Sequence, residues 1–478
     1  MVFCDVSKAF DRVWHRGLLL KLEMYGIQGE LLDWFSSYIS NRNQSVFVNG
    51  ALSKPRTLKA GVPRGSVLGP FLFIVYVNEV ADKLNCITRL FADDTSLGDF
   101  SKEKQLVEKS LNENLASLSS WAKEWLINYN PEKTEAMMFS LNNNDKSIDL
   151  YFNGCRIKVV DFHKHLGLTF SSNGGWSHHI DYIVKKTSKM ICALRKLKYL
   201  LNRNTLDKIY KMFIRPHFEY ACEVWDGCFI EQSNKLERLQ MEAARIVTGL
   251  PKYTPSRYLY YETGWELLSE RRRKRKLCLF YKINQDIAST FLKELLPPSV
   301  GHKNRYNLRN SDNYCLPFTR LRHSTLSFVP STIKLWNSLS TDIRESPSIS
   351  AFRSKLTSNQ NIAPHYFSYG IRKLNVIHTR LRYTTSTLNY DLYRINIKTD
   401  PVCQCGFPCE NAVHYFLDCP LYIQQRKTLF AGLKNVLDNR IPLDINLILY
   451  GNTDLSLCDN EHLFKLVHLY IGQTKRFA

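Results

Sequence analysis

The sequence lacks a long hydrophobic run. The longest one, FLFIVYV at residues 71–77, is far shorter than the ~20 apolar residues that a membrane-spanning helix needs. The chain opens MVFCDVSKAF, without the basic segment and apolar core of a secretory signal peptide. We therefore expect no membrane partner and an intracellular location, nuclear or cytoplasmic.

Acidic residues are scarce relative to basic ones. The chain has 44 Asp and Glu against 65 Lys and Arg, which gives a net charge of +21. An excess of this size favours a polyanionic partner, and nucleic acid before a membrane surface. A soluble basic protein without such a partner would have the same composition.

A disulfide framework is also missing. The 13 cysteines are an odd number and are scattered along 478 residues without a repeated spacing, which indicates a reducing compartment. The sequence shows no internal repeat and no low-complexity tract. A chain of this length has room for several domains with cores of their own.

Local patterns predict a mixture of strands and helices. VFCDV at residues 2–6 reads as a buried strand, TEAMMFS at 134–140 as another, and residues 103–126 as a long helix. Asn49-Gly50 and Asn153-Gly154 are hairpin turns by their residue types. The order of these elements predicts an α+β fold, with an antiparallel sheet and helices on one of its faces.

Two later segments are basic. Residues 177–217 have a helical apolar stripe, and most of their lysines fall off it, so that they face solvent or phosphate: Lys185, Lys186, Lys189, Lys196 and Lys198. ERRRKRK at 270–276 also has helical character. A solvated helix face and a localisation signal both fit that second run.

Adjacent carboxylates interrupt two short apolar runs in LFADDTSL. Asp93 and Asp94 would lie at the tip of a strand-turn-strand unit, where like charges repel unless a cation or solvent screens them. A further carboxylate, Asp5, ends the first predicted strand. Carboxylates on rigid elements brought side by side are the ligands that a two-Mg²⁺ polymerase site requires. A simple solvated turn at Asp93 is the alternative.

Five segments together identify a family resemblance. DVSKAFDRVWH, GVPRGSVLGPFLF, LFADD, NPEKTEAMMFS and HKHLGLTF occur in this order and resemble motifs A to E of the reverse transcriptases of non-LTR (LINE-type) retrotransposons, near the Jockey and CR1 groups. The resemblance implies a right-hand polymerase palm. It implies an RNA template, a DNA primer or target DNA, deoxynucleoside triphosphates as substrates, and two Mg²⁺ ions.

The resemblance assigns the acids their roles. Asp5 and Asp93 match the catalytic metal ligands, and Asp94 matches the adjacent acid. By the same resemblance the backbone carbonyl of Val6 would complete a metal shell, and Phe10 matches the family's aromatic residue beside the incoming sugar, where its ring would clash with a ribose 2′-OH. A core phenylalanine is the alternative for Phe10.

Other motifs imply contacts to nucleotide and primer. The motif B loop brings Gly65 close to the nascent base pair, while Arg64 stands where many relatives have Gln. Lys133 lies near the triphosphate by this resemblance, although an exposed lysine without a role fits equally well. A tight turn would form the primer grip: Leu166, Gly167 and Leu168. The basic helices that follow would be the thumb, which holds duplex through its phosphates.

A second group of metal ligands lies near the C-terminus, in CQCGFPCENAVHYFLDCP. Its soft ligands are Cys403, Cys405, Cys409, His414 and Cys419, and four of the five suffice for tetrahedral Zn²⁺. Cys405, Cys409, His414 and Cys419 would approach the spacing of a retroviral zinc knuckle. The segment resembles more closely the C-terminal Cys-His segment of the same retrotransposon proteins, which favours Cys403, Cys405, His414 and Cys419. Free buried cysteines are the remaining alternative.

The sequence begins almost on motif A, so we expect most of the polymerase fingers to be missing. The expected division is a palm over residues 1–172, a helical thumb over 173–265, a basic helical segment over 266–300, an unassigned region over 301–395, the Cys-His segment over 396–435 and a tail over 436–478. Three functions compete: an RNA-directed DNA polymerase, a truncated remnant that only binds nucleic acid, and an assembly partner for a full-length copy of the element.

Overall fold

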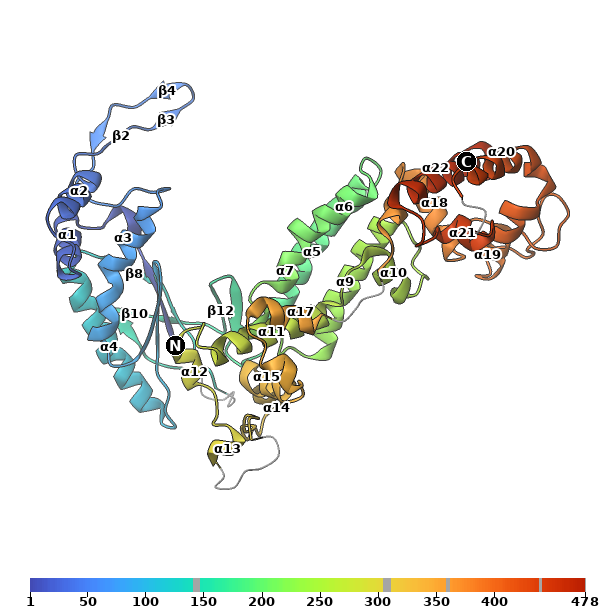
Figure 1. The fold of residues 1–478 in the computed structure, drawn as a ribbon. Coiled ribbons are helices and arrows are strands. Elements are labelled where there is room, and N and C mark those ends of the chain that lie inside the picture. The colour runs from blue at the N-terminus through green and yellow to red at the C-terminus, as the bar shows by residue number, and fades with distance from the viewer. Residues whose placement is uncertain (141–146, 304–310, 358–361, 438–440, 478) are drawn as a thin grey trace. The chain divides into compact units, whose positions relative to one another are not determined.

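The computed structural model describes residues 1–140, 147–303, 311–357, 362–437 and 441–477. Strands and helices are mixed in the first part of the chain, and helices dominate the rest (Figure 1). The chain divides into two compact units, Met1–His178 and His179–Ala478.

The first unit contains all the named strands of the described residues. Its strands are β1 (Val2–Val6), β2 (Asn43–Gln44), β3 (Phe47–Val48), β4 (Ala51–Leu52), β5 (Arg56–Thr57), β6 (Ile87–Phe91), β7 (Asp94–Gly98), β8 (Tyr129–Ala136), β9 (Tyr151–Phe152), β10 (Cys155–Arg156), β11 (Lys158–Val159), β12 (Phe162–His165) and β13 (Leu168–Ser171). Its helices are η1 (Ala9–Asp11), α1 (His15–Met24), α2 (Glu30–Ile39), α3 (Leu68–Val77), η2 (Asn78–Lys83) and α4 (Lys104–Glu124).

A five-stranded sheet forms the centre of this unit, in the order β11-β8-β1-β7-β6. Strand β1 is antiparallel to both β7 and β8, and β6 is antiparallel to β7. The prediction of an antiparallel sheet fails only at one edge, where the two-residue strand β11 pairs with β8 in parallel. A strand of two residues is too short to show the alternation of apolar and polar residues by which strands are predicted, so the sequence does not predict β11 or its partner.

The pleat of β1 divides the sheet into a covered face and an open face. Val2 and Cys4 lie in the main apolar cluster together with Leu97 of β7 and Ala136 of β8. Successive side chains point to opposite faces of a strand, so Phe3 and Asp5 belong to the other face. The helices therefore lie on one face of the sheet, as the sequence predicts.

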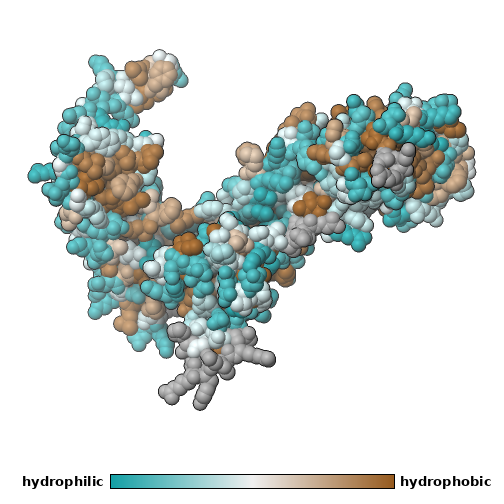
Figure 2. Space-filling view, in the orientation of Figure 1, coloured by the Kyte–Doolittle hydropathy of each residue, from teal (hydrophilic) through white to brown (hydrophobic). Residues whose placement is uncertain are grey.

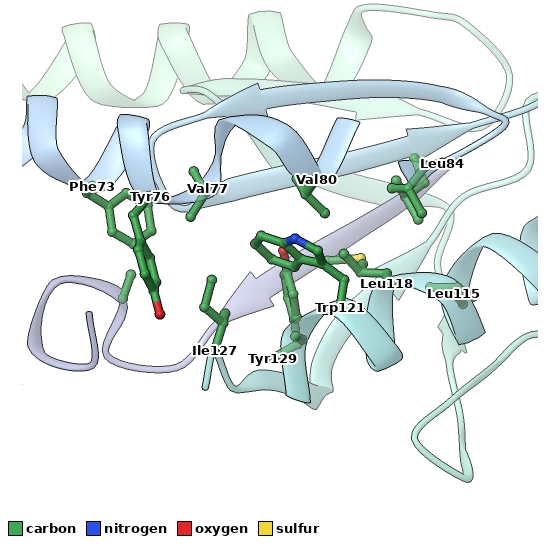
Figure 3. Packing of buried hydrophobic residues seen from close by; sticks show 14 of the residues in the cluster. Phe73, Tyr76, Val77, Val80, Leu84, Leu115, Leu118, Trp121, Ile127 and Tyr129 are labelled. Carbon is green, nitrogen blue, oxygen red and sulfur yellow. The ribbon is translucent and has the colours of Figure 1, made fainter. Parts of the chain in front are cut away.

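Helix α4 supplies much of that apolar core. Leu115, Leu118 and Trp121 are buried along one side of the helix, against Val80 and Leu84 (Figure 3). Their spacing of three residues keeps them on one helical stripe. The predicted helix over 103–126 is confirmed within two residues at each end.

One charge is buried inside this core. Lys21 of α1 donates to the carbonyl oxygen of Tyr76 at 2.5 Å and lies 3.2 Å from Glu79 Oε1. Its ammonium group also lies 3.7 Å from the ring centroid of Trp125. Burial lowers the pKa of Lys21, and the carboxylate of Glu79 opposes that shift. The buried ammonium is thus compensated by three different groups.

Both hairpin predictions are confirmed. Asn49 and Gly50 connect β3 to β4 with φ angles of 49° and 83°, and Asn153 and Gly154 connect β9 to β10 with 49° and 79°. Two consecutive positive φ angles are typical of a type I′ turn, which Asn-Gly adopts readily. The strand predicted at 134–140 begins earlier, since β8 covers Tyr129–Ala136.

The second unit is helical in its described residues. Its longer helices are α5 (Ser177–Leu197, which begins at the end of the first unit), α6 (Arg203–Ile209), α9 (Ile230–Thr248), α10 (Ser256–Thr263), α11 (Leu268–Asn284), α15 (Phe328–Asn337), α17 (Ile349–Leu356), α18 (Arg372–Arg382), α20 (Ile423–Lys434) and α22 (Leu457–Thr474). The shorter ones are η3 (Tyr210–Ile214), α7 (Arg215–Glu219), α8 (Cys222–Trp225), α12 (Thr290–Glu294), α13 (Val300–Lys303), α14 (Arg322–Leu326), α16 (Thr341–Arg344), η4 (His365–Ser368), α19 (Asn389–Tyr393), η5 (His414–Asp418), η6 (Pro420–Tyr422) and α21 (Ile445–Tyr450).

The basic run at 270–276 lies in α11 but is not a solvated face. Arg272 and Lys276 are only 1% and 6% exposed, and both contact the carboxylate of Asp226, at 2.7 Å and 2.6 Å. The other four cations also have acidic partners: Arg271 with Glu219, Arg273 with Glu270, Lys274 with Glu266 and Arg275 with Glu223. The solvated-face interpretation is therefore wrong at the two buried positions. The acids that compensate this run come from α7, from α8 and the residue after it, and from α11 and the residues just before it.

No helix among the described residues combines the length and the apolar character needed to cross a bilayer. This agrees with the short hydrophobic runs in the sequence.

The core of the first unit gives a test of its packing. We expect Leu118→Ala to lower the free energy of unfolding by about 2–5 kcal/mol, because it leaves a cavity where a fully buried side chain packs. Leu106→Ala is the matched control, since Leu106 lies on the same helix with 54% of its surface exposed. Urea unfolding followed by tryptophan fluorescence measures both. Equal midpoints for the two variants would contradict this description of the core.

Candidate active site and Cys-His cluster

Two of the predicted catalytic acids lie where neighbouring strands meet their connecting loops: Asp5 is the next-to-last residue of β1, and Asp94 is the first residue of β7. Cys4 pairs with Thr95 in the β1–β7 ladder, so the next step in antiparallel register brings Asp5 opposite Asp94, the first residue of β7. Directly opposed residues share a face of the sheet. Asp5 and Asp94 therefore both belong to the open face.

Asp93 lies in the loop between β6 and β7. Phe91 pairs with Asp94, so only Ala92 and Asp93 connect the strands, and Ala92 has a φ of 51°. The prediction of an acidic hairpin tip is confirmed. Both Asp93 and Asp94 are exposed, whereas Asp5 is half-buried. These are hard oxygen ligands that a divalent cation can reach.

The open face carries a group of histidines that the sequence did not reveal. Phe3 stacks on His163 of β12, with ring centroids 3.9 Å apart, and His163 Nδ1 donates to Glu135 Oε2 at 2.8 Å. Burial lowers the pKa of His165, and the negative charge of Asp94 opposes that shift. Thus the β12–β13 hairpin lies close to the acids, although it follows them by about 70 residues in sequence.

Strand β8 bulges beside Asp5. Phe3 pairs with Glu135, but Asp5 pairs with Asn130, so the register shifts between these two steps. The bulge holds Pro131, which has no N–H to donate and is tolerated at such a position. It also holds Lys133, which is exposed. The predicted triphosphate lysine thus projects from the strand next to Asp5.

The motif B loop passes over the turn that follows β1. Val62 N donates to the carbonyl oxygen of Phe10, and Gly61 N donates to that of Val13, both at 2.8 Å. Gly61 has a φ of 97°, and a Cβ on it would lie 3.0 Å from Asp11 Cα. Only glycine permits this approach. The backbone contact fixes Phe10, whose ring lies 5.0 Å from that of Phe73.

Arg64 forms an ion pair that the sequence does not predict. Its Nη2 donates to Asp11 Oδ2 at 2.6 Å, and both side chains are about half exposed or more, at 64% and 48%. Gly65 follows with a φ of 76°, and a Cβ added to it would meet no other atom within 4 Å. Val6 pairs with Tyr129 of β8 and packs at the margin of the core.

The predicted primer-grip segment is a tight turn. His165 pairs with Leu168, so Leu166 and Gly167 alone connect β12 to β13, with φ angles of 47° and 79°. This is again the type I′ pattern, but here a leucine occupies the first left-handed position. A leucine there costs conformational energy that asparagine largely avoids. Leu166 and Gly167 are exposed and Leu168 is buried.

The C-terminal ligands converge. The candidate ligand atoms of Cys403, Cys405, His414 and Cys419 all lie within 4.8 Å of one another. The Sγ atoms of Cys403 and Cys419 are 3.8 Å apart, and Cys405 Sγ is 3.3 Å from His414 Nε2. Three sulfurs and one imidazole at this separation suit a tetrahedral Zn²⁺ ion. Cys403, Cys405, His414 and Cys419 are the set that the resemblance favours.

Cys409 lies outside this group. Its sulfur accepts a hydrogen bond from Asn411 Nδ2 at 3.6 Å. Within the group, the ring of His414 stacks on the ring of Phe407, with centroids 4.2 Å apart. Burial raises the pKa of Cys403 to about 12, so that a cation is what would stabilise its thiolate.

The cluster is part of a larger core. Cys403 and Cys419 pack with residues of α18, α20, α21 and α22. Arg476, near the end of the chain, donates to Glu410 Oε2 at 2.6 Å, and Asn389 N donates to the same oxygen at 2.8 Å. The loop that carries the ligands is thereby fixed to helices on both sides of it.

Comparison with known proteins identifies the class. Residues 1–199 match the family model described as reverse transcriptase (RNA-dependent DNA polymerase). Over these residues the chain is therefore similar to reverse transcriptases, in agreement with the resemblance of its five motifs.

The chain is also similar to individual proteins of transposable elements. The chain is 28% identical over 291 residues to the probable RNA-directed DNA polymerase from transposon BS of Drosophila melanogaster, covering 56% of this chain and 31% of that protein. It is 30% identical over 266 residues to the RNA-directed DNA polymerase from mobile element jockey of the same species, covering 53% and 29%. Thus the aligned part spans about a third of those relatives. A Pol polyprotein from the type-1 retrotransposable element R1 of Bradysia coprophila is 23% identical over 452 residues, covering 90% of this chain and 41% of that protein.

The strained turn gives a test. We expect Leu166→Asn to stabilise the protein by about 1 kcal/mol, because asparagine tolerates the left-handed conformation better than leucine. The reciprocal control is Asn153→Leu, at the same position of the β9–β10 turn, which should destabilise by at least as much, because it also removes the hydrogen bond that Ser119 Oγ donates to Asn153 Oδ1. Thermal unfolding of both variants measures the difference. A destabilising Leu166→Asn would mean that contacts of the leucine side chain outweigh the backbone strain.

Proposed function

We propose that this chain is an RNA-directed DNA polymerase that extends a DNA primer on an RNA template by two-metal nucleotidyl transfer. One observation carries the proposal: Asp5 and Asp94 lie opposite each other on adjacent strands, on the open face of the sheet, and Asp93 occupies the loop beside them. The match of residues 1–199 to the reverse transcriptase family supports it.

The residues present suit Mg²⁺. Asp5 and Asp93 would hold two ions with the backbone carbonyl of Val6, and Asp94 would be the adjacent acid. When bound, Mg²⁺ neutralises the triphosphate and lowers the pKa of the attacking primer hydroxyl. The chain's own contribution is to hold these oxygens on a strand end and a two-residue loop, both of which are fixed by the sheet.

The neighbouring groups have roles in the same proposal. Lys133, on the bulge beside Asp5, would compensate the charge of the leaving pyrophosphate. Phe10 would exclude a ribose 2′-OH, and its backbone is held by the motif B loop that carries Gly65. The Arg64 contact to the nucleotide would require its ion pair with Asp11 to open, since this pair occupies the guanidinium here.

In this proposal the parts of the chain correspond to the palm and the thumb of a polymerase. The sheet and its helices over residues 1–172 would be the palm, and the helices over 173–265 the thumb. On α5, Lys185, Lys186 and Lys189 are exposed while Ile180 and Ile191 are buried. Lysines on the free side of such a helix can contact the phosphates of a template–primer duplex without reading its sequence. The turn at Leu166–Leu168 would position the primer end.

We also propose that the Cys-His cluster binds one Zn²⁺ through Cys403, Cys405, His414 and Cys419. The convergence of these four ligands within 4.8 Å supports this set. The knuckle-like set would need Cys409 as a ligand, but the sulfur of Cys409 accepts a hydrogen bond from Asn411 instead, which disfavours that set. Such a centre would stabilise the surrounding helices and would present the segment to the element's RNA or target DNA.

The alternatives to a polymerase are a remnant that only binds nucleic acid and an assembly partner for a full-length copy. The presence of every motif A and motif C acid argues against the first. An assembly partner would copurify with the full-length protein and would not need Asp93.

The polymerase proposal is tested by primer extension with the purified chain supplied with a fingers segment, an RNA template, a DNA primer, deoxynucleoside triphosphates and Mg²⁺. We expect extension, and a loss of roughly a thousandfold for Asp5→Ala and Asp93→Ala, because each change removes a metal ligand from the reacting centre. Asp82→Ala is the control, since Asp82 is an exposed acid in η2. Binding of template–primer without extension by the unaltered chain would establish the remnant function. Retention of more than about a tenth of the rate by Asp93→Ala would refute the catalytic assignment.

The zinc proposal is tested on the full chain by metal analysis and by the absorption spectrum of the Co²⁺-loaded protein. We expect about one zinc per chain, and its loss in Cys405→Ser and Cys419→Ser but not in Cys409→Ser. Loss in Cys409→Ser together with retention in Cys403→Ser would show that the knuckle-like set is correct. A chain that takes up no zinc would contradict both sets.

A further inference from the structure

The β12–β13 hairpin lies on the open face of the central sheet but belongs to a sheet of its own. Strands β12 and β13 pair with each other and, among the described strands, with no other. The chain just before the hairpin is fixed at the edge of the central sheet, where Val160 N donates to the carbonyl oxygen of Ala136 at 2.8 Å. Backbone bonds therefore hold the base of the hairpin, whereas side chains must fix the position of its turn.

A stack of rings connects the hairpin to strand β1. The ring of His163 lies on that of Phe3, with centroids 3.9 Å apart and an angle of 13° between the planes. His163 Nδ1 donates to Glu135 Oε2 at 2.8 Å, and Glu135 is the residue of β8 directly opposite Phe3. His165, on the same side of β12, has its ring 5.1 Å from that of Phe3. His163 thus contacts two neighbouring strands of the sheet.

The contact is closely packed. Phe3 is only 5% exposed, although it faces away from the main apolar core. Elements outside the sheet must therefore cover it, and the rings of His163 and His165 do so. The side chains of His163 and Glu135 are 16% and 29% exposed. Water is largely excluded from their hydrogen bond, which strengthens it.

The spacing along β12 determines where the turn lies. Burial lowers the pKa of His165, and Asp94 is near enough for its carboxylate to oppose that shift. The turn at Leu166–Gly167 begins at the next residue. Since an extended strand advances about 3.3 Å per residue, the turn begins about 10 Å from His163, on the side where the acids lie.

These contacts do not depend on what covers the outer surface of the unit. Exposed apolar side chains gather over α2 and α3 (Figure 2), where Trp34 and Phe71 are each 50% exposed. The chain spans only about a third of the length of its relatives from the BS and jockey elements, so other parts of such proteins can cover that surface. The contacts of His163 lie inside the unit instead.

We propose that His163 is a positioning residue for the primer terminus. It holds β12 to two strands of the sheet through Phe3 and Glu135. It thereby fixes the distance between the Leu166–Gly167 turn and Asp5. This role rests on the proposed polymerase function, in which the turn positions the primer end. Misplacement of a reacting atom by about 1 Å can slow a chemical step about a hundredfold, so the loss of this contact should affect the rate far more than the affinity.

Single-turnover primer extension tests this role, with the full chain supplied with a fingers segment, an RNA template, a DNA primer, saturating deoxynucleoside triphosphates and Mg²⁺. We expect His163→Ala to lower the rate per active site about tenfold or more. The Kd for template–primer should stay within about twofold, because phosphate contacts elsewhere supply most of that affinity. The amplitude of the first turnover measures the number of active sites, so a loss of stability alone would lower the amplitude and leave the rate unchanged.

Two variants remove only the hydrogen bond and keep the rings stacked. His163→Phe and Glu135→Leu should each lower the rate about threefold, and they test the role even where His163→Ala does not fold. Phe162→Ala is the matched control. Phe162 is the neighbouring residue of β12, and its ring contacts that of His178 instead of the sheet, with centroids 3.8 Å apart. We expect its rate within about twofold of the unaltered chain, since it shares no partner with His163.

Three results would contradict this role. A rate per active site within about twofold of the unaltered chain for His163→Ala would overturn it. An equal loss in Phe162→Ala would also overturn it, because general packing of the hairpin would then explain the effect. A His163→Phe variant as slow as His163→Ala would refute the contribution of the ring stack. Failure of the proposed function is distinguishable from all three: the unaltered chain would then not extend the primer, and the role of His163 would be refuted with it.

Discussion

The alternation of side chains along β1 is the constraint on which the first unit depends. Val2 and Cys4 are held in the helical core, and this fixes Phe3 and Asp5 on the opposite face. The acids of the neighbouring hairpin then follow from register alone, since Asp94 is the residue opposite Asp5. A slip of one residue would place the carboxylate of Asp5 in the core, where an unpaired charge is very unfavourable. Burial of the apolar side chains of this strand therefore also determines where the proposed catalytic acids lie.

Several of the turns in this unit can be predicted from the residues of the turn itself. Asn-Gly pairs identify type I′ turns because few residues tolerate two consecutive positive φ angles, and the acids of LFADD lie at a hairpin tip as that spacing predicts. The turn at Leu166 has no such signal, and only the resemblance to motif E points to it. The same holds for Cys403 against Cys409, where spacing alone allowed either ligand set.

Other features depend on contacts between distant segments, which no local pattern encodes. Arg64 and Asp11 are 53 residues apart, and Arg272 lies 46 residues from Asp226. A run of basic residues looks the same in sequence whether water or carboxylates surround it. For this reason the residues of α11 also fit a solvated face. The contact between His163 and Glu135 likewise joins distant segments, so the sequence does not predict it. The direction of β11 likewise follows from the path of the chain and not from its residues.

The bulge in β8 bears on how related chains can differ in length. Asn130 and Glu135 both lie opposite residues of the open face, although an odd number of positions separates them, and the bulge absorbs the mismatch. The two halves of the strand are therefore paired independently of one another. Evolutionary insertions or deletions between Pro131 and Thr134 can be accommodated without exchanging the two faces of the sheet. A gap in a sequence alignment at this point would displace Lys133 and leave both flanking halves of the strand in place.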